Sequence, residues 1–261
     1  MQGFTHIVAR TGGIAFGLAT HAFFAVTVWH LVWFLAGHGP GVVSEPTNAS
    51  TTLQAVVVDA ALATLFTVPH SVLLLPAVRR TLTTHLVPQA FYGCFYCVAT
   101  CAVLLTTILA WQPADVVIWA WPASLSRWVS AAFIGCWLLL LYSLHLTGLG
   151  YQTGLTPWWR WVRGLPQERR EFRPRGAYCI LRHPVYLSFL GLVWFTPVVT
   201  LDRAVLIAIW TGYIYVGSVL KDRRLAFFIG DPYREYQARV PGYPGIPAGP
   251  LARVPLGTMG R

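Results

Sequence analysis

The stretch "CILRHPVYLSFLGLVWF", residues 179–195, places an arginine, a histidine and a proline directly before a continuous apolar segment. Pro184 has no N–H and a φ angle suited to a helix, so it fits the first helical position. The proline also disfavours helical backbone at the residue before it, His183. We therefore expect a helix to begin at Pro184, with unpaired N–H groups and the positive end of its dipole available to a carboxylate or phosphate.

Two further side chains surround this helix start. Tyr186 follows Arg182 by four residues and His183 by three, a spacing that allows all three to point to one spot. The spacing leaves two interpretations open. Either Arg182 reaches the lipid headgroups and Tyr186 belongs to an interfacial aromatic belt, or the three residues hold a polar ligand at the membrane surface.

The composition is that of a membrane protein. Of the 261 residues, 56% are hydrophobic and 11% are charged, whereas about a quarter of a soluble domain is charged. Long apolar segments recur, and each is near the ~20 residues that a helix needs to cross ~30 Å of hydrocarbon. The segments are 13–37, 53–78, 89–111, 128–150, 184–201 and 204–220. They predict an all-α polytopic membrane helix bundle of about six transmembrane helices, the last two forming a helical hairpin.

The basic residues are distributed unevenly between the ends of these segments. With six spans, 17 of the 19 Lys and Arg residues lie on one side, and only Arg127 and Arg203 lie on the other. The positive-inside rule then places both termini and the 151–182 loop in the cytoplasm, as in a multi-pass protein of a bacterial inner membrane. Topology thus accounts for the net charge of +10, and we expect a lipid bilayer and no nucleic acid as partner.

The chain changes character near residue 150. Residues 1–150 predict an N-terminal region of four transmembrane helices with short links. Residues 151–261 combine an arginine-dense, aromatic cytoplasmic loop, the membrane hairpin and a cytoplasmic tail. Two polar segments therefore flank one hairpin.

The C-terminal region resembles the integral-membrane methyltransferases of the isoprenylcysteine carboxyl methyltransferase type. The pattern of that family is roughly G-x-Y, R-H-P-x-Y, a hairpin, two glutamates, F-G-x-x-Y-x-x-Y and V-P. The matching positions are Gly176 and Tyr178, RHPVY at 182–186, KD at 221–222, IGDPYREY at 229–236, and Val240 with Pro241. Most of the chain is similar to the methanethiol S-methyltransferase branch and its NnrU-like relatives, through "PHSVLLLPAVRRTLTTHLVPQ" (69–89), "LLLLYS" (138–143), "TGLTPWWRWVRG" (153–164) and "WFTPVVT" (194–200).

This resemblance implies an enzyme that transfers a methyl group from S-adenosyl-L-methionine to a small thiol, such as methanethiol, and gives dimethyl sulfide. A helix N-terminus suits the carboxylate of that cofactor, and aromatic faces suit its sulfonium cation. The thiolate is the attacking form of a thiol, so a nearby cation would help. The resemblance implies cofactor contacts, and no metal, at Arg173, Tyr178, His183, Pro184, Val185, Tyr186 and Asp222, and catalytic roles for Asp222 and for Arg182 or Arg223.

One position departs from the family pattern. Lys221 and Asp222 stand where the family has two glutamates. A lysine beside a sulfonium is electrostatically unfavourable, so we expect Lys221 to point to lipid headgroups and Asp222 to help seat the cofactor. A rebuilt cofactor site and the loss of methyl transfer are the alternatives.

Other functions stay open on the same residues. NnrU-like relatives include haem-binding isomerases, for which His21, His30 and His145 could be axial ligands; we favour histidines that hydrogen-bond between helices. A carboxyl methyltransferase of a lipidated or isoprenoid substrate and a non-catalytic binding protein are the further alternatives.

Three more groups of residues have structural interpretations. Cys94, Cys97 and Cys101 share one helix face, and we interpret them as packing residues rather than metal ligands. The tryptophans near span ends, for example Trp158, Trp159 and Trp161, are interpreted as interfacial anchors. Asp59 and His70 lie about three turns apart on one predicted helix, so each should face its own partner.

Overall fold

The computed structural model describes residues 2–38, 49–114, 116–167 and 171–255. The chain divides into two compact units. The first unit comprises Met1–Asp115 and Gly148–Arg169, and the second unit comprises Val116–Thr147 and Arg170–Arg261. Each unit contains three long apolar segments of the predicted bundle, together with short helices that follow them.

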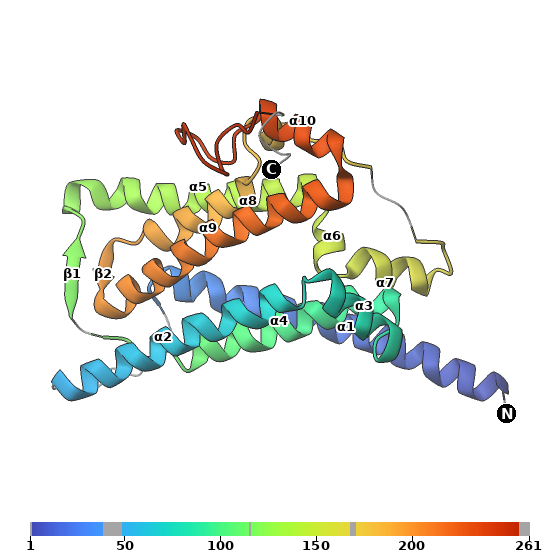
Figure 1. Ribbon diagram of the computed structural model, residues 1–261. Helices are drawn as coiled ribbons and strands as arrows, with labels where there is room; N and C mark the ends of the chain where they lie inside the picture. Colours follow the sequence, from blue (N-terminus) through green and yellow to red (C-terminus); the bar gives the residue numbers. More distant parts are fainter. Residues whose placement is uncertain (1, 39–48, 115, 168–170, 256–261) are drawn as a thin grey trace. The chain divides into compact units, whose positions relative to one another are not determined.

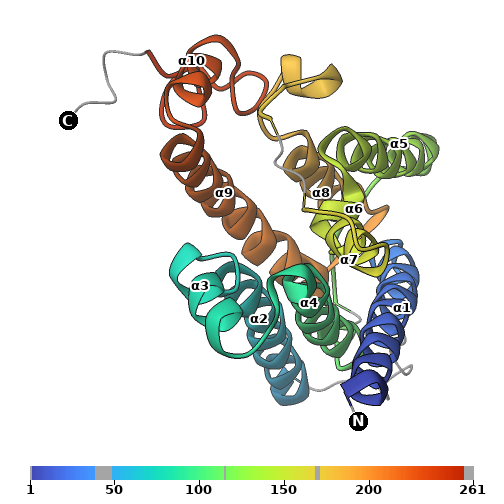
Figure 2. The same cartoon turned by 90° about the vertical axis from the view of Figure 1, so that its right-hand side faces the viewer.

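In the first unit, α4 (Tyr92–Leu109) lies between α1 (Gln2–Leu35) and α2 (Ala49–Val72) (Figure 2). Phe16 contacts Phe91 near the start of α4, and Phe34 contacts Trp111 just after its end. The helices α1 and α4 therefore run in the same direction. Short elements complete the unit: α3 (Pro76–His85), η1 (Gln89–Phe91), α6 (Leu149–Gln152) and α7 (Leu155–Val162).

Close fits between small and large residues hold this unit together. A Cβ atom at Gly17 would overlap the indole of Trp158, so only glycine leaves room for α7 against α1. The indole Nε1 of Trp158 donates to the carbonyl of Gly13 at 2.9 Å. Gly154, with φ +81°, lies so close to Gly93 that a Cβ atom on either residue would meet the other's backbone.

The second unit is built around a long hairpin. Its helices α5 (Ala123–Thr147), α8 (Pro184–Trp194) and α9 (Leu201–Ile229) lie side by side, and α10 (Asp231–Arg239) follows α9 (Figures 1 and 2). The 3-10 helix η2 (Gly176–Cys179) precedes α8. At the opposite end, β1 (Val117–Ala120) pairs antiparallel with β2 (Val198–Thr200).

The predicted span 184–201 is wrong in one respect, because the helix ends at Trp194. An 11-residue helix is only about 16 Å long, too short to cross a bilayer alone. The chain nevertheless runs the full length of α5. Gly176 lies against Tyr142 near the end of α5, and Val198 pairs with Ala120 just before its start. A short helix and an extended segment thus replace the expected continuous helix.

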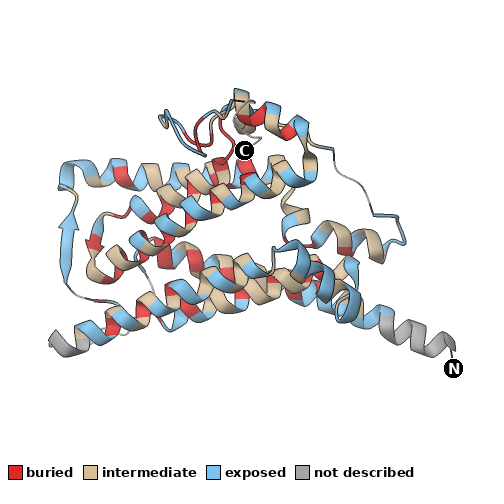
Figure 3. Cartoon of the chain, in the orientation of Figure 1, coloured by how far each residue is buried: buried red, intermediate tan, exposed pale blue. Residues whose placement is uncertain are grey.

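The other five predicted spans are helices of sufficient length and hydropathy to cross a membrane, within the part of the chain that the structure describes. They are Arg10–Leu35, Thr52–Val72, Gln89–Leu109, Ala123–Thr147 and Leu201–Ile229. Large apolar side chains on them are exposed, for example Leu18 (60%), Leu53 (65%) and Leu138 (64%), as Figure 3 shows along the helices. Helices with apolar outer faces require lipid around them. The protein is therefore an integral membrane protein with an all-α polytopic fold.

The boundary between the two units does not coincide with the predicted division of the chain at residue 150. The helix α5 packs along α8 and so belongs with the C-terminal part, whereas α6 and α7 pack on α4 and α1. Gly148, with φ 76°, ends α5 and redirects the chain between the units. Hydropathy marks where a segment crosses a membrane, but not which neighbour it packs against.

Several side chains of the first unit have partners that the sequence did not predict. Trp158 is buried rather than an interfacial anchor, because its indole fills the space above Gly17. His21 and His30 bond to carbonyls of their own helix, at 2.6 Å and 2.8 Å, so the expected bonds between helices are not formed at these Nδ1 atoms. The buried Cys94 lies 3.6 Å from the carbonyl oxygen of Gly154.

Asp59 and His70 have separate partners, as the spacing predicted. Asp59 is buried, and its Oδ1 accepts a hydrogen bond from the backbone N–H of Gln112 at 2.9 Å. The Nδ1 atom of His70 lies 2.9 Å from the hydroxyl of Tyr96. Both residues tie α2 to α4 or to the chain just after it.

Candidate functional site

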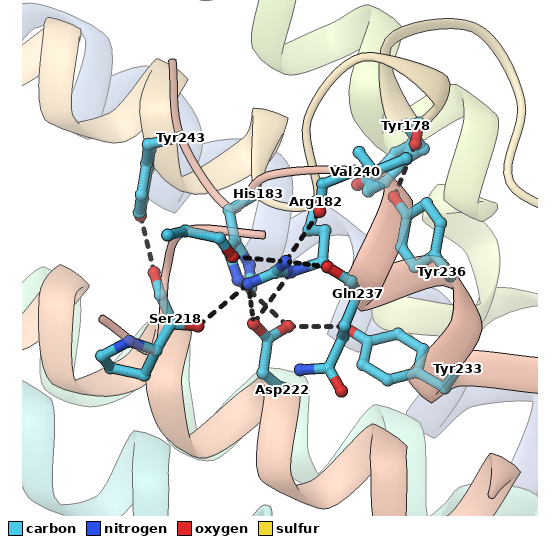
Figure 4. A network of polar contacts seen from close by, with 12 residues as sticks. Tyr178, Arg182, His183, Ser218, Asp222, Tyr233, Tyr236, Gln237, Val240 and Tyr243 are labelled. Atoms are coloured by element: carbon cyan, nitrogen blue, oxygen red, sulfur yellow. Dashed lines mark hydrogen bonds and ion pairs between the residues drawn. The ribbon is translucent and has the colours of Figure 1, made fainter. Parts of the chain in front are cut away.

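The start of α8 and the last turns of α9 meet in a cluster of buried polar side chains. We call Arg182, His183, Asp222 and Tyr233 the polar cluster (Figure 4). Pro184 occupies the first turn of α8, as predicted, and His183 is the N-cap residue with φ −124° and ψ 50°. The proline thus fixes the direction in which both residues before it enter the cluster.

Arg182 is the centre of the polar cluster. Its side chain is fully buried, and its Nε and Nη2 atoms donate to Oδ2 of Asp222 at 3.0 Å and 2.9 Å. Two charge-assisted hydrogen bonds to one carboxylate oxygen are stronger than bonds between neutral groups and orient both partners. The interpretation that Arg182 reaches lipid headgroups is therefore wrong.

The remaining donors of Arg182 bind the chain that follows α9. Its Nη1 atom donates to the carbonyls of Gln237, Val240 and Ala252 at 3.2 Å, 2.7 Å and 3.0 Å, and Nη2 donates to the carbonyl of Pro250 at 3.0 Å. We call residues 240–255 the C-terminal segment. Because every N–H of the guanidinium has a protein acceptor, Arg182 is a residue that positions this segment.

Asp222 connects three elements through its two oxygens. Besides Arg182, Tyr233 of α10 donates its hydroxyl to Oδ1 at 2.5 Å, and Nε2 of His183 lies 3.1 Å from the same oxygen. Burial, followed by the nearby Asp222 carboxylate, raises the pKa of Tyr233, so its hydroxyl stays a donor. The carboxylate is compensated by the guanidinium and by the hydroxyl of Tyr233, with the ring of His183 close by, and a buried charge requires such partners.

His183 lies between two aromatic rings. Its ring is stacked on Tyr186, with centroids 5.6 Å apart, and lies 5.6 Å from Tyr243 of the C-terminal segment. The hydroxyl of Tyr243 lies 2.6 Å from that of Ser218 on α9, and burial raises its pKa to about 12. Among the described residues, neither ring nitrogen of His183 has a hydrogen-bond partner, although Nε2 lies within ion-pair distance of Asp222. Burial lowers the pKa of His183, although Asp222 opposes this, so a neutral imidazole is favoured at pH 7.

Lys221 does not point away from this site, contrary to the expectation. Its ammonium lies over the ring of Tyr186, 5.0 Å from the centroid. A cation at this distance from an aromatic face is attracted by the ring quadrupole. Lys221 and Asp222 are neighbours on α9, yet one joins the polar cluster and the other covers the adjoining aromatic ring.

The structure brings together only part of the predicted site. Tyr178 lies in η2, where its carbonyl accepts the hydroxyl of Tyr236 at 2.5 Å. Arg173 is exposed and pairs with Glu171 at 2.6 Å, and Arg223 is exposed on α9. Neither arginine reaches the polar cluster.

The sequence did not assign roles to several residues that complete the cluster. Tyr233 and Tyr236 lie three residues apart on α10, and their rings contact Phe172 at 5.3 Å and 5.4 Å. The signal was present in "IGDPYREY", whose tyrosines repeat at helical spacing. Nothing in the sequence marked Ser218 and Tyr243, which come together across 25 residues.

The start of α8 offers groups that suit an anion and groups that suit a cation. The first turn of α8 leaves the N–H groups of Val185 and Tyr186 without intrahelical acceptors, as every helix start does. The aromatic rings of Tyr186 and Tyr243 lie beside the ring of His183, the N-cap residue of this helix. Within the described residues, no group of His, Cys, Asp or Glu side chains could hold a metal ion.

These features define a class: a polytopic helical membrane protein with a polar site where a membrane hairpin opens. No family model and no solved structure matches the chain. Among curated relatives, it is 31% identical over 187 residues to methanethiol S-methyltransferase of Pseudomonas deceptionensis, covering 71% of each chain. It is 30% identical over 228 residues to methanethiol S-methyltransferase 1 of Bradyrhizobium diazoefficiens, covering 86% of this chain and 79% of the relative.

A third relative has a different name. The chain is 27% identical over 187 residues to nurim of Danio rerio, covering 67% of this chain and 66% of that protein. The extent and identity of the two bacterial matches decide the family. The chain belongs to the methanethiol S-methyltransferase family of integral membrane methyltransferases.

Proposed function

We propose that this protein transfers the methyl group of S-adenosyl-L-methionine to methanethiol and so forms dimethyl sulfide. The observation that carries the proposal is the start of α8, where a helix N-terminus, a buried imidazole and an aromatic face meet. The names of the relatives support the acceptor, since two of them are methanethiol S-methyltransferases over most of the chain.

The residues at the start of α8 fit the proposed cofactor. The N–H groups of Val185 and Tyr186 would hold its carboxylate, and Pro184 presets the helix that presents them. The Nδ1 atom of His183 is buried without a hydrogen-bond partner among the described residues. With the proton of the neutral ring on Nε2 toward Asp222, Nδ1 would accept a hydrogen bond from the ammonium of the cofactor. Once bound, the cofactor supplies an electrophilic methyl group on a sulfonium.

The polar cluster acts in this proposal by positioning. Asp222 holds Nε2 of His183, and Arg182 holds Asp222 and the C-terminal segment that carries Tyr243. The ring of His183 is therefore fixed between Tyr186 and Tyr243. Asp222 contributes through His183, while Tyr178 and Arg173 lie outside the cluster.

We also propose that both termini lie in the cytoplasm of a bacterial inner membrane. The start of α8 and the C-terminal segment lie at the same end of the second unit, since Arg182 bonds to four carbonyls of the chain after α9. This is the end with most basic residues, which the positive-inside rule assigns to the cytoplasm. Cysteine labelling from either side of the membrane tests the orientation.

The activity is tested with the full chain in lipid nanodiscs. With S-adenosyl-L-methionine and methanethiol present, gas chromatography of the headspace should detect dimethyl sulfide. The His183→Ala variant should bind the cofactor roughly ten- to a hundredfold more weakly by calorimetry, as expected for the loss of a partner of a charged group. Leu190→Ala, on the same helix, is the matched control and should retain affinity.

Two results would contradict the proposal. The first is equal loss of cofactor affinity in Leu190→Ala and His183→Ala, with unchanged thermal midpoints. The second is no dimethyl sulfide and no stabilisation by the cofactor. In that case, a Soret band in the absorbance spectrum would favour haem, and its absence would favour a non-catalytic binding protein.

A further inference from the structure

Lys221 is a cation at the site that the polar cluster does not use. Its ammonium lies over Tyr186 at 5.0 Å from the ring centroid. Among the described residues, the ion pairs with carboxylates are made by arginines and by His183, not by Lys221. Both oxygens of Asp222 are already in contact with Arg182, His183 and Tyr233. An anion that reaches the face of Tyr186 would therefore meet the ammonium of Lys221.

The arginines near the helix start are worse placed for this role. All N–H groups of Arg182 have acceptors within the protein. Arg223 is exposed and follows Lys221 by two residues, so it projects about 200° away around α9. Lys221 thus contacts the site through the aromatic ring of Tyr186. An anion can replace this contact.

The surroundings of Lys221 are defined by few charged or titratable groups. Asp222 and Arg224 face it from its own helix, and Tyr186 faces it from α8. Tyr186 in turn faces tyrosines of η2, α9 and the C-terminal segment, namely Tyr178, Tyr213 and Tyr243. Apart from Asp222, which is held by Arg182, the described residues around Lys221 offer no anion to the ammonium.

We propose that Lys221 holds the sulfur of the methyl acceptor as a thiolate, so that a small thiol becomes ionised within the site. The proposal rests on the methyl transfer proposed above. A carboxylate acceptor is ionised at neutral pH without help, whereas a thiol is mostly protonated. A lysine at position 221 therefore suits a thiol, and it explains chemically why a cation stands beside Asp222.

The chemical step transfers no proton to or from Lys221. The thiol gives its S–H proton to solvent water as the sulfur settles beside the ammonium. A lone pair of the thiolate forms a bond to the methyl carbon of the sulfonium donor, and the electron pair of the broken bond goes to the departing sulfur. One cation and one anion become two neutral sulfides, so nothing then holds the product to Lys221.

The test compares Lys221→Met with Lys221→Arg over neutral and alkaline pH. Lys221→Met should lower kcat/KM for methanethiol about 10- to 100-fold at pH 7, because a contacting cation lowers the pKa of a thiol by about one to two units. The deficit should shrink as the pH rises, and Lys221→Arg should retain most activity. Methaneselenol, which ionises more readily than a thiol, should be methylated by Lys221→Met at close to the wild-type rate.

A second measurement does not depend on turnover. Methanethiol is titrated by calorimetry into protein loaded with S-adenosylhomocysteine, in two buffers of different ionisation enthalpy. Wild type should release protons on binding the thiol, and Lys221→Met should release fewer. Arg234→Met, which removes an equal charge from an exposed position on α10, should behave like wild type.

Several outcomes would overturn the proposal. The first is that Lys221→Met keeps the wild-type pH profile and the wild-type proton release. The second is that the expected change in the pH profile occurs in Arg223→Met or Arg224→Met instead. Weaker cofactor binding with an unchanged pH profile would make Lys221 a cofactor ligand. If Lys221→Met does not fold, Lys221→Gln and Lys221→Arg decide by the same readouts. If wild type transfers no methyl group, the proposed function fails, and proton release on thiol binding alone decides the role of Lys221.

Discussion

Both units contain glycines that fit closely against their neighbours, and the second unit adds a buried ion pair. In the first unit, glycines meet large side chains or backbone, as Gly17 does with Trp158 and Gly93 with Gly154. In the second unit, a buried ion pair between Arg182 and Asp222 joins α8, α9 and the C-terminal segment. Helix pairs can be held by shape alone, whereas an irregular segment presents carbonyls that need donors. A guanidinium with five donors meets that need at one point.

The largest effect should come from breaking the ion pair. Asp222→Asn leaves the guanidinium of Arg182 buried without its countercharge, which costs about 3–5 kcal/mol in comparable buried pairs. We expect a lower midpoint of thermal unfolding in detergent and rapid tryptic cleavage after Arg239, because the C-terminal segment loses its anchor. Asp231→Asn, whose carboxylate pairs with Arg234 at an exposed position, should cost no more than about 0.5 kcal/mol.

The comparison would fail if both aspartate variants behaved alike. Equal midpoints for Asp222→Asn and wild type, with the C-terminal segment still protected, would mean that the buried pair does not stabilise the second unit. Loss of cofactor affinity in Asp222→Asn is expected as a consequence, since His183 would lose the carboxylate that orients it.

The elements that were predicted correctly are those that depend on local rules. Pro184 begins α8 because its ring fixes φ and removes a donor, and that requires no knowledge of the rest of the fold. The end of the same helix was missed, although Pro197 disfavours helical backbone at Thr196 before it. Hydropathy continued past Trp194, and hydropathy does not distinguish a helix from an extended segment that pairs with β1.

The sequence predicted the central residues of the candidate site but not the contacts that they make. Arg182, His183, Tyr186 and Asp222 were named from the motif, and the structure brings them together. The partners of Arg182 lie 40 to 70 residues further along the chain, so no local pattern indicates that its donors are all used. The position of Lys221 over Tyr186 likewise depends on the packing of α8 against α9.

A smaller effect should follow from disturbing the shape-based contacts of the first unit. Gly17→Ala places a methyl group into the indole of Trp158, and overpacking of this kind costs about 1–3 kcal/mol. Gly12→Ala is the matched control on the same helix, because a Cβ atom there meets nothing within 4 Å. The control should be neutral or stabilising by up to about 1 kcal/mol, as alanine favours a helix.

The chain has 12 tryptophans, so the fluorescence of Trp158 is taken as the difference between each protein and its Trp158→Phe counterpart, and it then provides a local readout beside the unfolding midpoint. A red shift in Gly17→Ala but not in Gly12→Ala would show that α7 has moved away from α1. Equal midpoints and spectra in the two variants would show that the fit between Gly17 and Trp158 does not hold these helices.

The smallest effect should be a pH dependence of stability in the second unit. Burial lowers the pKa of His183 below its ordinary value, so the unfolded chain takes up a proton at a pH where the folded chain does not. The resulting stabilisation is fully present above about pH 6.5, the ordinary histidine value, and is lost as the pH falls toward the lower folded pKa. The midpoint of thermal unfolding should therefore decrease over this interval in wild type and less steeply in His183→Gln. The remaining histidines are common to both proteins, so the difference in slope isolates His183, and identical slopes would mean that its imidazole is not held neutral by burial.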